Sequence, residues 1–472
     1  MSPVSAFAQS AWPVLVETDI KHIYSTARDN HPGFIDDENS YFKQWLEIGY
    51  VQAIEAAKSA QSLDDALTIT QRYIAGFADG HFGFGAQYQP RYLTWTGLNI
   101  ELFGDDYRVS FVDEKHSEHM PSALAKLISC DGVPVQTIMD NDLLPYRFNA
   151  PNLRFPKVRF ASKLLLNDGI GKQTQFSACQ FEHQGKVETI PLSWQPISQN
   201  RYNQLTQNQT PPKQFAFEMV APKQYWASFP SFSPNDKQLS TLRTTIQELA
   251  EVSSAAERII IDVRGNGGGN SEWGVEIAKA LYGESFIESH LQQNPDNSYA
   301  LWRVSSANTE YLKQILPQLE IEFGKDSAMY ADFSTLAEDM SDALQKNQRF
   351  VKQGSSTPQN QTISPSLVNT KTQAHIVFLT DSRCSSACLD FADLLLKLPN
   401  VKHVGQETGA DTVYMDVRVV ELPSRLGMYS LAQKVYRGRP RQHNESYVPT
   451  YNFSGDIEDT KQLKTWINSL VF

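Results

Sequence analysis

Three short stretches carry the residues best suited to covalent chemistry. RCSSACLDFAD, residues 383–393, places Ser385 and Ser386 between two cysteines and ahead of an apolar run. GFADGHFGFG, residues 76–85, sets His81 in a glycine-flanked turn, and histidine is the usual general base for a serine. DVRGNGGGN, residues 262–270, offers glycine N–H groups to an anion or a developing oxyanion. Each stretch alone also has an ordinary structural interpretation. The serines can be simple helix caps, the histidine can be an incidental loop residue, and the glycines can form only a tight turn.

The two serines are not equivalent if a helix begins near Cys384. At about 100° per residue, one apolar stripe is formed by Cys384, Cys388, Phe391, Ala392, Leu395 and Leu398. Ser386 falls roughly opposite this stripe, whereas Ser385 falls nearer to it. We therefore expect Ser386 to face an open surface at a helix start, where free N–H groups and the helix dipole favour an oxyanion. The alternative is that both serines simply cap the helix.

The elements that position these residues follow from the apolar pattern. Residues 15–78 have helical spacing, and residues 93–196 alternate as strands do. After a Gln- and Asn-rich linker, the buried strands ERIIIDV and AHIVFLT alternate with helices, which is typical of an α/β domain with a partly parallel sheet. We predict an N-terminal helical domain at 12–92, a strand-rich domain at 93–197 and an α/β core at 214–472. Polar, mostly helical residues 290–372 interrupt this core as an insertion, which we interpret as a candidate lid.

Composition excludes several classes of function. The chain has 472 residues and a net charge of −11 with acids and bases mixed, which argues against nucleic acid as a partner. No run of about 18 apolar residues predicts a membrane span. The glycine-rich stretch lacks the Lys-Ser/Thr ending of a phosphate-binding loop and the spacing of a dinucleotide site. We expect neither a metal nor a cofactor.

The four cysteines and the N-terminus bear on the compartment. Cys384 and Cys388 lack a second close pair of ligands, so zinc is not expected, and a local disulfide and buried thiols both stay open. Ala6-Phe7-Ala8 resembles the small-residue end of an export signal, although the basic and long apolar regions are missing. We expect a periplasmic or secreted protein.

In this order, the stretches resemble the C-terminal processing (tail-specific) protease family of serine peptidases, in its tricorn-core-like and retinoid-binding-protein-like branch. The matching segments, within 15–90 and 220–460, are ADGH, YWASFPSF, IIIDVRGNGGG and SACLDFAD followed by VKHVGQETGAD. The resemblance implies an α/β core of crotonase-like fold. AKLISCDGVPVQTI resembles part of a PDZ-like domain, which the family often carries and which binds extended chain ends by adding a strand.

Carried over residue by residue, the resemblance implies that Ser386 is the nucleophile. The N–H group of Ala387, with that of Gly267 or Gly268, would form the oxyanion hole. A disulfide between the cysteines that flank the serines would stiffen the nucleophile turn, although helical cysteines four residues apart are near the limit of Cα separation.

The base is where this sequence departs from the bacterial enzymes. They use a lysine about one strand after the serine, and the corresponding residue here is Asp411. Tricorn-type members use an early histidine and a late glutamate, which correspond to His81 and to Glu445 in RPRQHNESYVP. Glu445 would then orient and charge the imidazole that deprotonates the serine. Lys434 is the alternative base, provided that desolvation lowers its pKa.

The predicted function is a serine endopeptidase that hydrolyses a peptide or protein substrate through an acyl-enzyme. Two alternatives remain at this point. One is a catalytically inactive peptide- or ligand-binding protein on the same scaffold. The other is an esterase-like hydrolase of non-peptide esters, which the same triad could serve.

Overall fold

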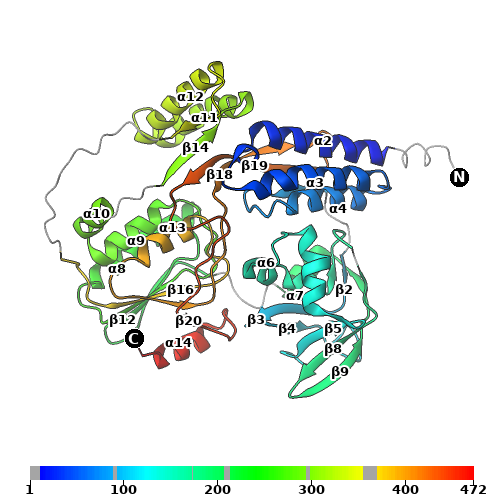
Figure 1. Cartoon of the computed structure of the whole chain (residues 1–472). Coiled ribbons are helices and arrows are strands. Elements are labelled where there is room, and N and C mark those ends of the chain that lie inside the picture. Colours follow the sequence, from blue (N-terminus) through cyan, green and yellow to red (C-terminus); the bar gives the residue numbers. More distant parts are fainter. Residues whose placement is uncertain are drawn as a thin grey trace.

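The described part of the chain comprises residues 11–88, 93–172, 174–206, 213–293, 298–353 and 369–471 of a computed structural model (Figure 1). The possible export-signal residues, Ala6 to Ala8, lie outside the described residues. Within the described ranges, no helix combines the length and the apolar character that a membrane crossing requires.

Three helices near the start of the chain pack on a β-hairpin near its end. The helices are α2 (Trp12–Asn30), α3 (Ser40–Ala57) and α4 (Leu63–Ala75), and the hairpin strands are β18 (Tyr414–Glu421) and β19 (Gly427–Arg437). Ile20 and Leu46 from the helices share a buried cluster with Tyr429 and Leu431 from the hairpin. The helices expected within 12–92 are present, and residues far along the sequence complete their core (Figure 1).

A strand-rich region follows and forms two separate sheets. Within each sheet, neighbouring strands run antiparallel. The larger sheet contains β3 (Leu98–Phe103), β4 (Asp106–Val112), β5 (Lys126–Cys130), β6 (Val133–Pro134), β8 (Ala178–His183) and β9 (Lys186–Pro191). The smaller contains β2 (Leu93–Trp95), β7 (Leu166–Asn167) and β10 (Gln195–Ile197). The short helices α5 (Val135–Ile138) and α6 (Arg154–Phe160) belong to the same region. A disulfide joins Cys130 on β5 to Cys179, directly opposite on β8.

The polar stretch after this region is not entirely a linker. Residues Gln199–Thr206 form helix α7, which the many Gln and Asn residues did not suggest. Tyr202 anchors this helix, because its ring is buried against Trp95 and its hydroxyl donates to Asn99 Oδ1 at 3.2 Å. One buried aromatic residue therefore attaches an otherwise polar helix to the strand-rich region.

A mixed sheet forms the centre of the C-terminal half. Its strands lie in the order β11 (Ala216–Ala221), β12 (Gln224–Ser228), β13 (Arg258–Asp262), β16 (His375–Thr380), β17 (Val401–Gly405) and β20 (Tyr451–Asn452). Only β11 and β12 pair antiparallel; all later neighbours are parallel. The expected α/β core with a partly parallel sheet is confirmed. Because the strands are parallel, the segments after β13, β16 and β17 emerge at one edge of the sheet.

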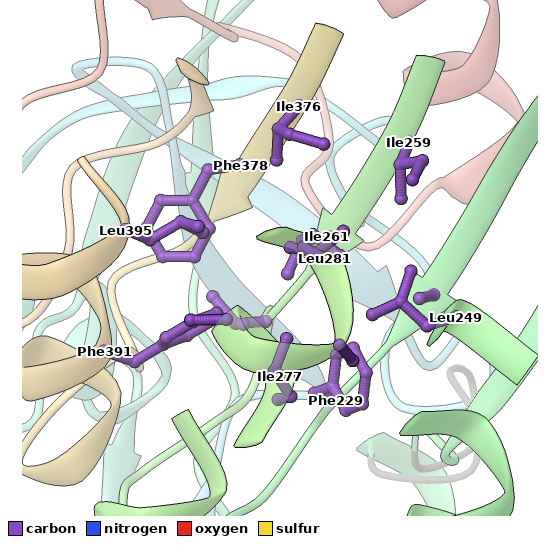
Figure 2. Close-up of a cluster of buried hydrophobic side chains, with 14 of the residues drawn as sticks. Phe229, Leu249, Ile259, Ile261, Ile277, Leu281, Ile376, Phe378, Phe391 and Leu395 are labelled. Carbon is purple, nitrogen blue, oxygen red and sulfur yellow. The ribbon is translucent and has the colours of Figure 1, made fainter. Parts of the chain in front are cut away.

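Helices cover both faces of this sheet, as the continuous apolar strands predict. Helices α8 (Asp236–Val252), α9 (Glu272–Tyr282) and α13 (Ala387–Leu395) lie on one face, and α14 (Thr460–Ser469) lies on the other (Figure 1). Ile261 and Phe378 point toward the first group of helices, where Ile277 and Phe391 meet them (Figure 2). The alternate strand residues face α14. Truncating one of these buried side chains to alanine should cost about 2–5 kcal/mol.

The insertion expected at 290–372 is helical in its described part, but it also contributes strands. It contains α11 (Ser306–Phe323), α12 (Ala328–Gln345), β14 (Tyr299–Arg303) and β15 (Phe350–Lys352), and α10 (Glu284–Gln293) precedes it. Strand β14 pairs with β19 and so extends the sheet beneath the N-terminal helices. None of the described residues of this insertion lines the main cavity. The role of the insertion as a lid stays a prediction.

Candidate active site

One cavity of about 1080 Å³ lies at the carboxyl ends of the parallel strands and brings the predicted residues together. Gly267 reaches it from the loop after β13, Ser386 from the segment after β16 and Asp411 from the segment after β17. His81 lines the same cavity from the turn between α4 and the short strand β1 (Phe84–Ala86), which pairs with β19. Ligands in α/β sheets bind at this edge because the strand ends leave a crevice there.

The glycine-rich loop is held rigidly by buried polar side chains. Arg264 is 2% exposed and binds the Asp262 carboxylate with Nε at 2.8 Å and Nη2 at 2.6 Å. Asn266 donates its amide to the Phe229 carbonyl at 2.9 Å and accepts the N–H group of Gly268 at 2.9 Å. These contacts leave the loop little freedom to move when charge develops beside it, which is what an oxyanion site requires.

The contacts of the loop distinguish the two glycines proposed for the oxyanion hole. The Gly268 N–H group already donates to Asn266, whereas that of Gly267, among the described residues, has no acceptor. Gly267 is also exposed to the cavity. Gly268 has a different requirement: φ is +100°, and an added Cβ would lie 2.7 Å from Ser386 Cβ and 3.0 Å from Ala387 N. A glycine at 268 therefore lets the loop approach the serine, and Gly267 is free to donate.

Ser386 occupies a strained turn directly before α13. Its φ is +53° and ψ is −125°, a combination that costs a non-glycine residue about 1–3 kcal/mol. The helix begins at Ala387, not near Cys384 as expected, so Ser386 is the residue before the first turn. Its side chain makes no capping hydrogen bond, and its hydroxyl is thus available to react. As the first residue of the helix, Ala387 has an N–H group without an intrahelical acceptor.

The neighbouring serine is arranged differently. Ser385 also lines the cavity, but its Oγ packs closely against Gly409, where an added Cβ would lie 2.3 Å away. The backbone N–H group of Ser385 donates to the carbonyl of Asn266 at 3.2 Å and links the serine turn to the glycine-rich loop. The simple capping interpretation does not hold for Ser386, because no cap bond forms.

A disulfide closes around both serines. Cys384 and Cys388 are bonded, their Cα atoms are 5.3 Å apart, and both residues are fully buried. Since Cys384 precedes the helix, this pair is not restricted to the Cα separation of two residues in one helix. The alternative of free thiols is excluded, and the strained turn lies inside a small covalent ring.

His81 directs one ring nitrogen toward two buried carboxylates. Its Nδ1 lies 3.5 Å from Asp411 Oδ1 and 4.0 Å from Asp79 Oδ1. Because Nδ1 is buried against these groups, Nε2 is the nitrogen left to accept a proton. Burial raises the pKa of Asp411, and the nearby His81 and arginines 439 and 441 offset part of that rise.

Asp79 fixes the turn that carries His81. Its Oδ1 accepts hydrogen bonds from the His81 N–H group at 2.8 Å and from Thr412 Oγ1 at 2.9 Å. Its Oδ2 lies 3.5 Å from Nε2 of His31, a fully buried ring stacked on Phe42. Burial lowers the pKa of His31. Burial opposes ionisation of Asp79, but its contacts with His31 and His81 outweigh this effect and lower the pKa of Asp79.

The structure places Glu445 and Lys434 away from the imidazole. Glu445 is exposed, and its carboxylate accepts a hydrogen bond from the Gln442 N–H group at 2.6 Å. The only ion-pair contacts of His81 within the described residues involve the two aspartates. Lys434 does not line the cavity and pairs with Asp416 at 2.5 Å. Burial opposes the charge of Lys434, but Asp416 outweighs it and raises the pKa of the ammonium, the opposite of what a lysine base needs.

Sequence reasoning missed the two aspartates. Asp79 was part of the matching segment ADGH, and Asp411 was noted only as the residue in place of a lysine. The two residues share a signal that could have found them: each is a carboxylate that directly follows an alanine in a short loop containing glycine. Among the described residues, no group of three or more His, Cys, Asp and Glu side chains is arranged to hold a metal ion.

Comparisons with known proteins agree with this fold. Residues 228–452 match the model of Peptidase family S41. The structure of mature CPAF complexed with lactacystin superposes with a TM-score of 0.63 at 12% identity, covering 97% of each chain. Mature CPAF alone gives the same TM-score and identity, with 97% of this chain and 96% of that chain covered. The photosystem II D1 C-terminal processing protease has a TM-score of 0.37 at 13% identity, over 94% and 93% of the two chains. No curated protein matches the sequence significantly.

Proposed function

We propose that this chain, whose residues 228–452 match the model of Peptidase family S41, is a serine endopeptidase that acts through an acyl-enzyme on Ser386. One observation carries this proposal. Ser386 is held in a strained turn with a hydroxyl free of capping, in a cavity that it shares with His81 and Gly267. Strain at a reactive serine is typical of a nucleophile that the surrounding structure holds in place.

We infer the following reaction for these groups. His81 Nε2 removes the proton of Ser386 Oγ as this oxygen attacks the substrate carbonyl. The oxyanion accepts hydrogen bonds from the N–H groups of Gly267 and Ala387, each worth about 3–4 kcal/mol in comparable sites. The imidazolium then protonates the leaving amine, and a water attacks the acyl-enzyme by the reverse sequence.

We assign the orientation of His81 to Asp411, with Asp79 behind it, rather than to Glu445. Asp411 lies nearest to Nδ1, and a carboxylate there favours the tautomer that keeps Nε2 unprotonated and stabilises the imidazolium that forms. The 3.5 Å separation is loose, as is common for catalytic contacts without substrate. Glu445 is backbone-paired with Asp411 and supports the segment that presents it.

We further propose that the strand-rich region, taken as PDZ-like, guides an extended chain to the serine. Side chains of this region form one wall of the cavity, among them Asn99, Phe148 and Phe155. A substrate between the two walls would contact both. This supports a tail-specific role, in which a chain end is held on one side of the cleavage site.

Export is also proposed. All four cysteines are paired in two disulfides, and such bonds persist in the periplasm or outside the cell. Fractionation of the producing cells tests this proposal: the mature chain should be recovered outside the cytoplasm with both bonds intact, and a reduced cytoplasmic pool would contradict it.

A fluorophosphonate probe and an unfolded protein substrate test the proposed reaction. Ser386→Ala should abolish both probe labelling and hydrolysis, whereas Ser385→Ala should reduce each only mildly. A fully active Ser386→Ala variant would refute the assignment. Wild-type protein that binds peptides without being labelled would instead be an inactive binding protein. Hydrolysis of esters but not of peptides would identify an esterase.

A further inference from the structure

A group of apolar side chains, the apolar wall, lines the cavity from the strand-rich region, whose Arg159 and Lys163 also line the cavity. The side chains of the apolar wall come from β3 and from the helical segment around α6: Leu102, Phe103, Phe148, Phe155 and Val158. The cavity is also lined by an ionic network in which Glu458 pairs with Lys213 and Arg383. It therefore offers both apolar and ionic groups to a substrate.

The apolar wall is attached to the segment that carries His81. Phe148 packs against Ala78 in a small buried cluster, and the ring of Phe155 meets Phe148 edge-on with a centroid separation of 4.9 Å. The N–H group of Asn149 donates to the carbonyl of Ala75 at 3.0 Å, at the end of α4. The distance along the chain from Ala78 to His81 is only three residues. Packing and one backbone hydrogen bond therefore link the wall to the turn that carries His81.

This attachment determines which part of a substrate meets the wall. In serine acyl transfer, the base gives its proton to the leaving amine, so the leaving group lies on the histidine side of the scissile bond. The acyl side lies toward the glycine-rich loop and Arg383, which also line the cavity. A side chain just after the scissile bond would therefore extend toward Phe148, Phe155 and Val158.

We propose that these three residues form a specificity subsite for a large apolar side chain at the first position after the scissile bond. The inference rests on the proposed function and names its substrate class. Burial of such a side chain stabilises the complex by about 25 cal/mol per Å² of apolar surface removed from water. A glycine at that position would bury no apolar side chain against these residues and would gain none of this stabilisation.

Acyl transfer tests the subsite separately from the reaction. An aryl ester acylates Ser386, and an amino-acid amide then competes with water for the acyl group. The α-amino nitrogen of the amino-acid amide attacks the acyl-enzyme carbonyl and gives a proton to His81. Ser386 Oγ then leaves and takes a proton from the imidazolium, and a new peptide bond forms. The amide occupies the leaving-group side, so its side chain probes the wall directly. The ratio of amide product to hydrolysis product is measured within each variant.

The expected result is that phenylalanine and leucine amides capture the acyl group at concentrations about tenfold or more below that of glycine amide. Val158→Asp should remove this preference. Val187→Asp, on the exposed strand β9 of the same region, is the matched control and should retain it. Equal capture of glycine and phenylalanine amides by the wild type, or equal effects of the two variants, would overturn the subsite. Failure of the ester to acylate Ser386 would instead refute the proposed function.

Discussion

The two disulfides should differ in which property they support. Removal of Cys130–Cys179 should cost more stability, and removal of Cys384–Cys388 should cost more activity. In the chain-entropy model, a disulfide stabilises a protein by restricting the unfolded chain, and its effect grows with the logarithm of the closed loop. Cys384 and Cys388 are separated by 4 positions and Cys130 and Cys179 by 49, which gives loops of five and fifty residues. At 25 °C these loops correspond to about 2 and about 4 kcal/mol.

The smaller loop should matter more for activity because it contains the proposed nucleophile. Ser386 lies inside it with a φ of +53°, a conformation that the unconstrained backbone avoids at a cost of about 1–3 kcal/mol. Without the disulfide, relaxation of the turn moves Oγ from the cavity and Ala387 N–H from the oxyanion. A loss of about 1.4–2.8 kcal/mol in positioning corresponds to a 10- to 100-fold slower acylation. Neither Cys130 nor Cys179 lines the cavity.

The assay combines denaturant unfolding with fluorophosphonate labelling under fully native conditions. Cys384→Ala/Cys388→Ala should lose about 2 kcal/mol of stability and label 10- to 100-fold more slowly. Cys130→Ala/Cys179→Ala should lose about 4 kcal/mol and, in its folded fraction, label at the wild-type rate. Wild-type labelling by the first variant would show that the ring does not hold the turn. Slow labelling by both would attribute the effect to general destabilisation.

Three further predictions concern single residues. Asp411→Asn should slow acylation by about 10²- to 10⁴-fold, whereas Glu445→Gln should change it less than about tenfold; the reverse order in a labelling assay would restore the glutamate as the orienting group. Gly268→Ala should lower activity by about 100-fold or more, because its Cβ would lie 2.7 Å from that of Ser386 at a positive φ, and a near-wild-type kcat would contradict this. Burial lowers the pKa of His403 to about 4, so between the unfolded value of about 6.5 and pH 4 only the unfolded state binds the proton. The free energy of unfolding should therefore fall by about 3 kcal/mol as the pH is lowered from about 6.5 to about 4. His403→Gln should remove this part of the pH dependence when unfolding by urea is measured. A stability difference between wild type and variant that does not change with pH would refute the prediction.

The architecture of the core could be predicted because its signals are local and strong. The run Ile259–Ile261 reads as a strand buried on both faces, and helices cover both faces. The order of strands and helices then fixes a parallel sheet, whose carboxyl edge gathers the glycine-rich loop and the serine turn. Helix α7 was missed because a single buried tyrosine, not a periodic stripe, attaches it to the strand-rich region.

Helical geometry selected Ser386 on a premise that was partly wrong. The stripe was counted from Cys384, but the helix begins at Ala387, and the residues before it form a strained turn. The prediction of an open hydroxyl held because Phe391 and Leu395 still face the core and orient the helix start. The positive φ of Ser386 was not predictable, since it arises from tertiary contacts and the disulfide rather than from intrinsic preference.

Which of the two carboxylates, Asp411 or Glu445, contacts His81 could not be predicted from the sequence, for a different reason. The two residues form an isolated antiparallel bridge, so their backbones lie side by side. Either carboxylate could be imagined next to the imidazole, and only side-chain direction separates them. Glu445 turns toward the N–H group of Gln442 within its own turn, whereas Asp411 turns inward. Such a choice depends on a few local hydrogen bonds that spacing alone does not encode.

The replacement of a lysine by Asp411 is consistent with a change of base. A carboxylate is far too weak to deprotonate a serine hydroxyl unaided, so a chain with an aspartate at this place needs another group to receive the proton. The same aspartate, buried and 3.5 Å from Nδ1 of His81, gains a role that a lysine could not fill, because an ammonium there would oppose formation of the imidazolium. Asp79 and His31 then support the turn from behind. We infer that Asp411 and His81 act as a pair, and that loss of either carboxylate contact should slow acylation without changing the position of Ser386.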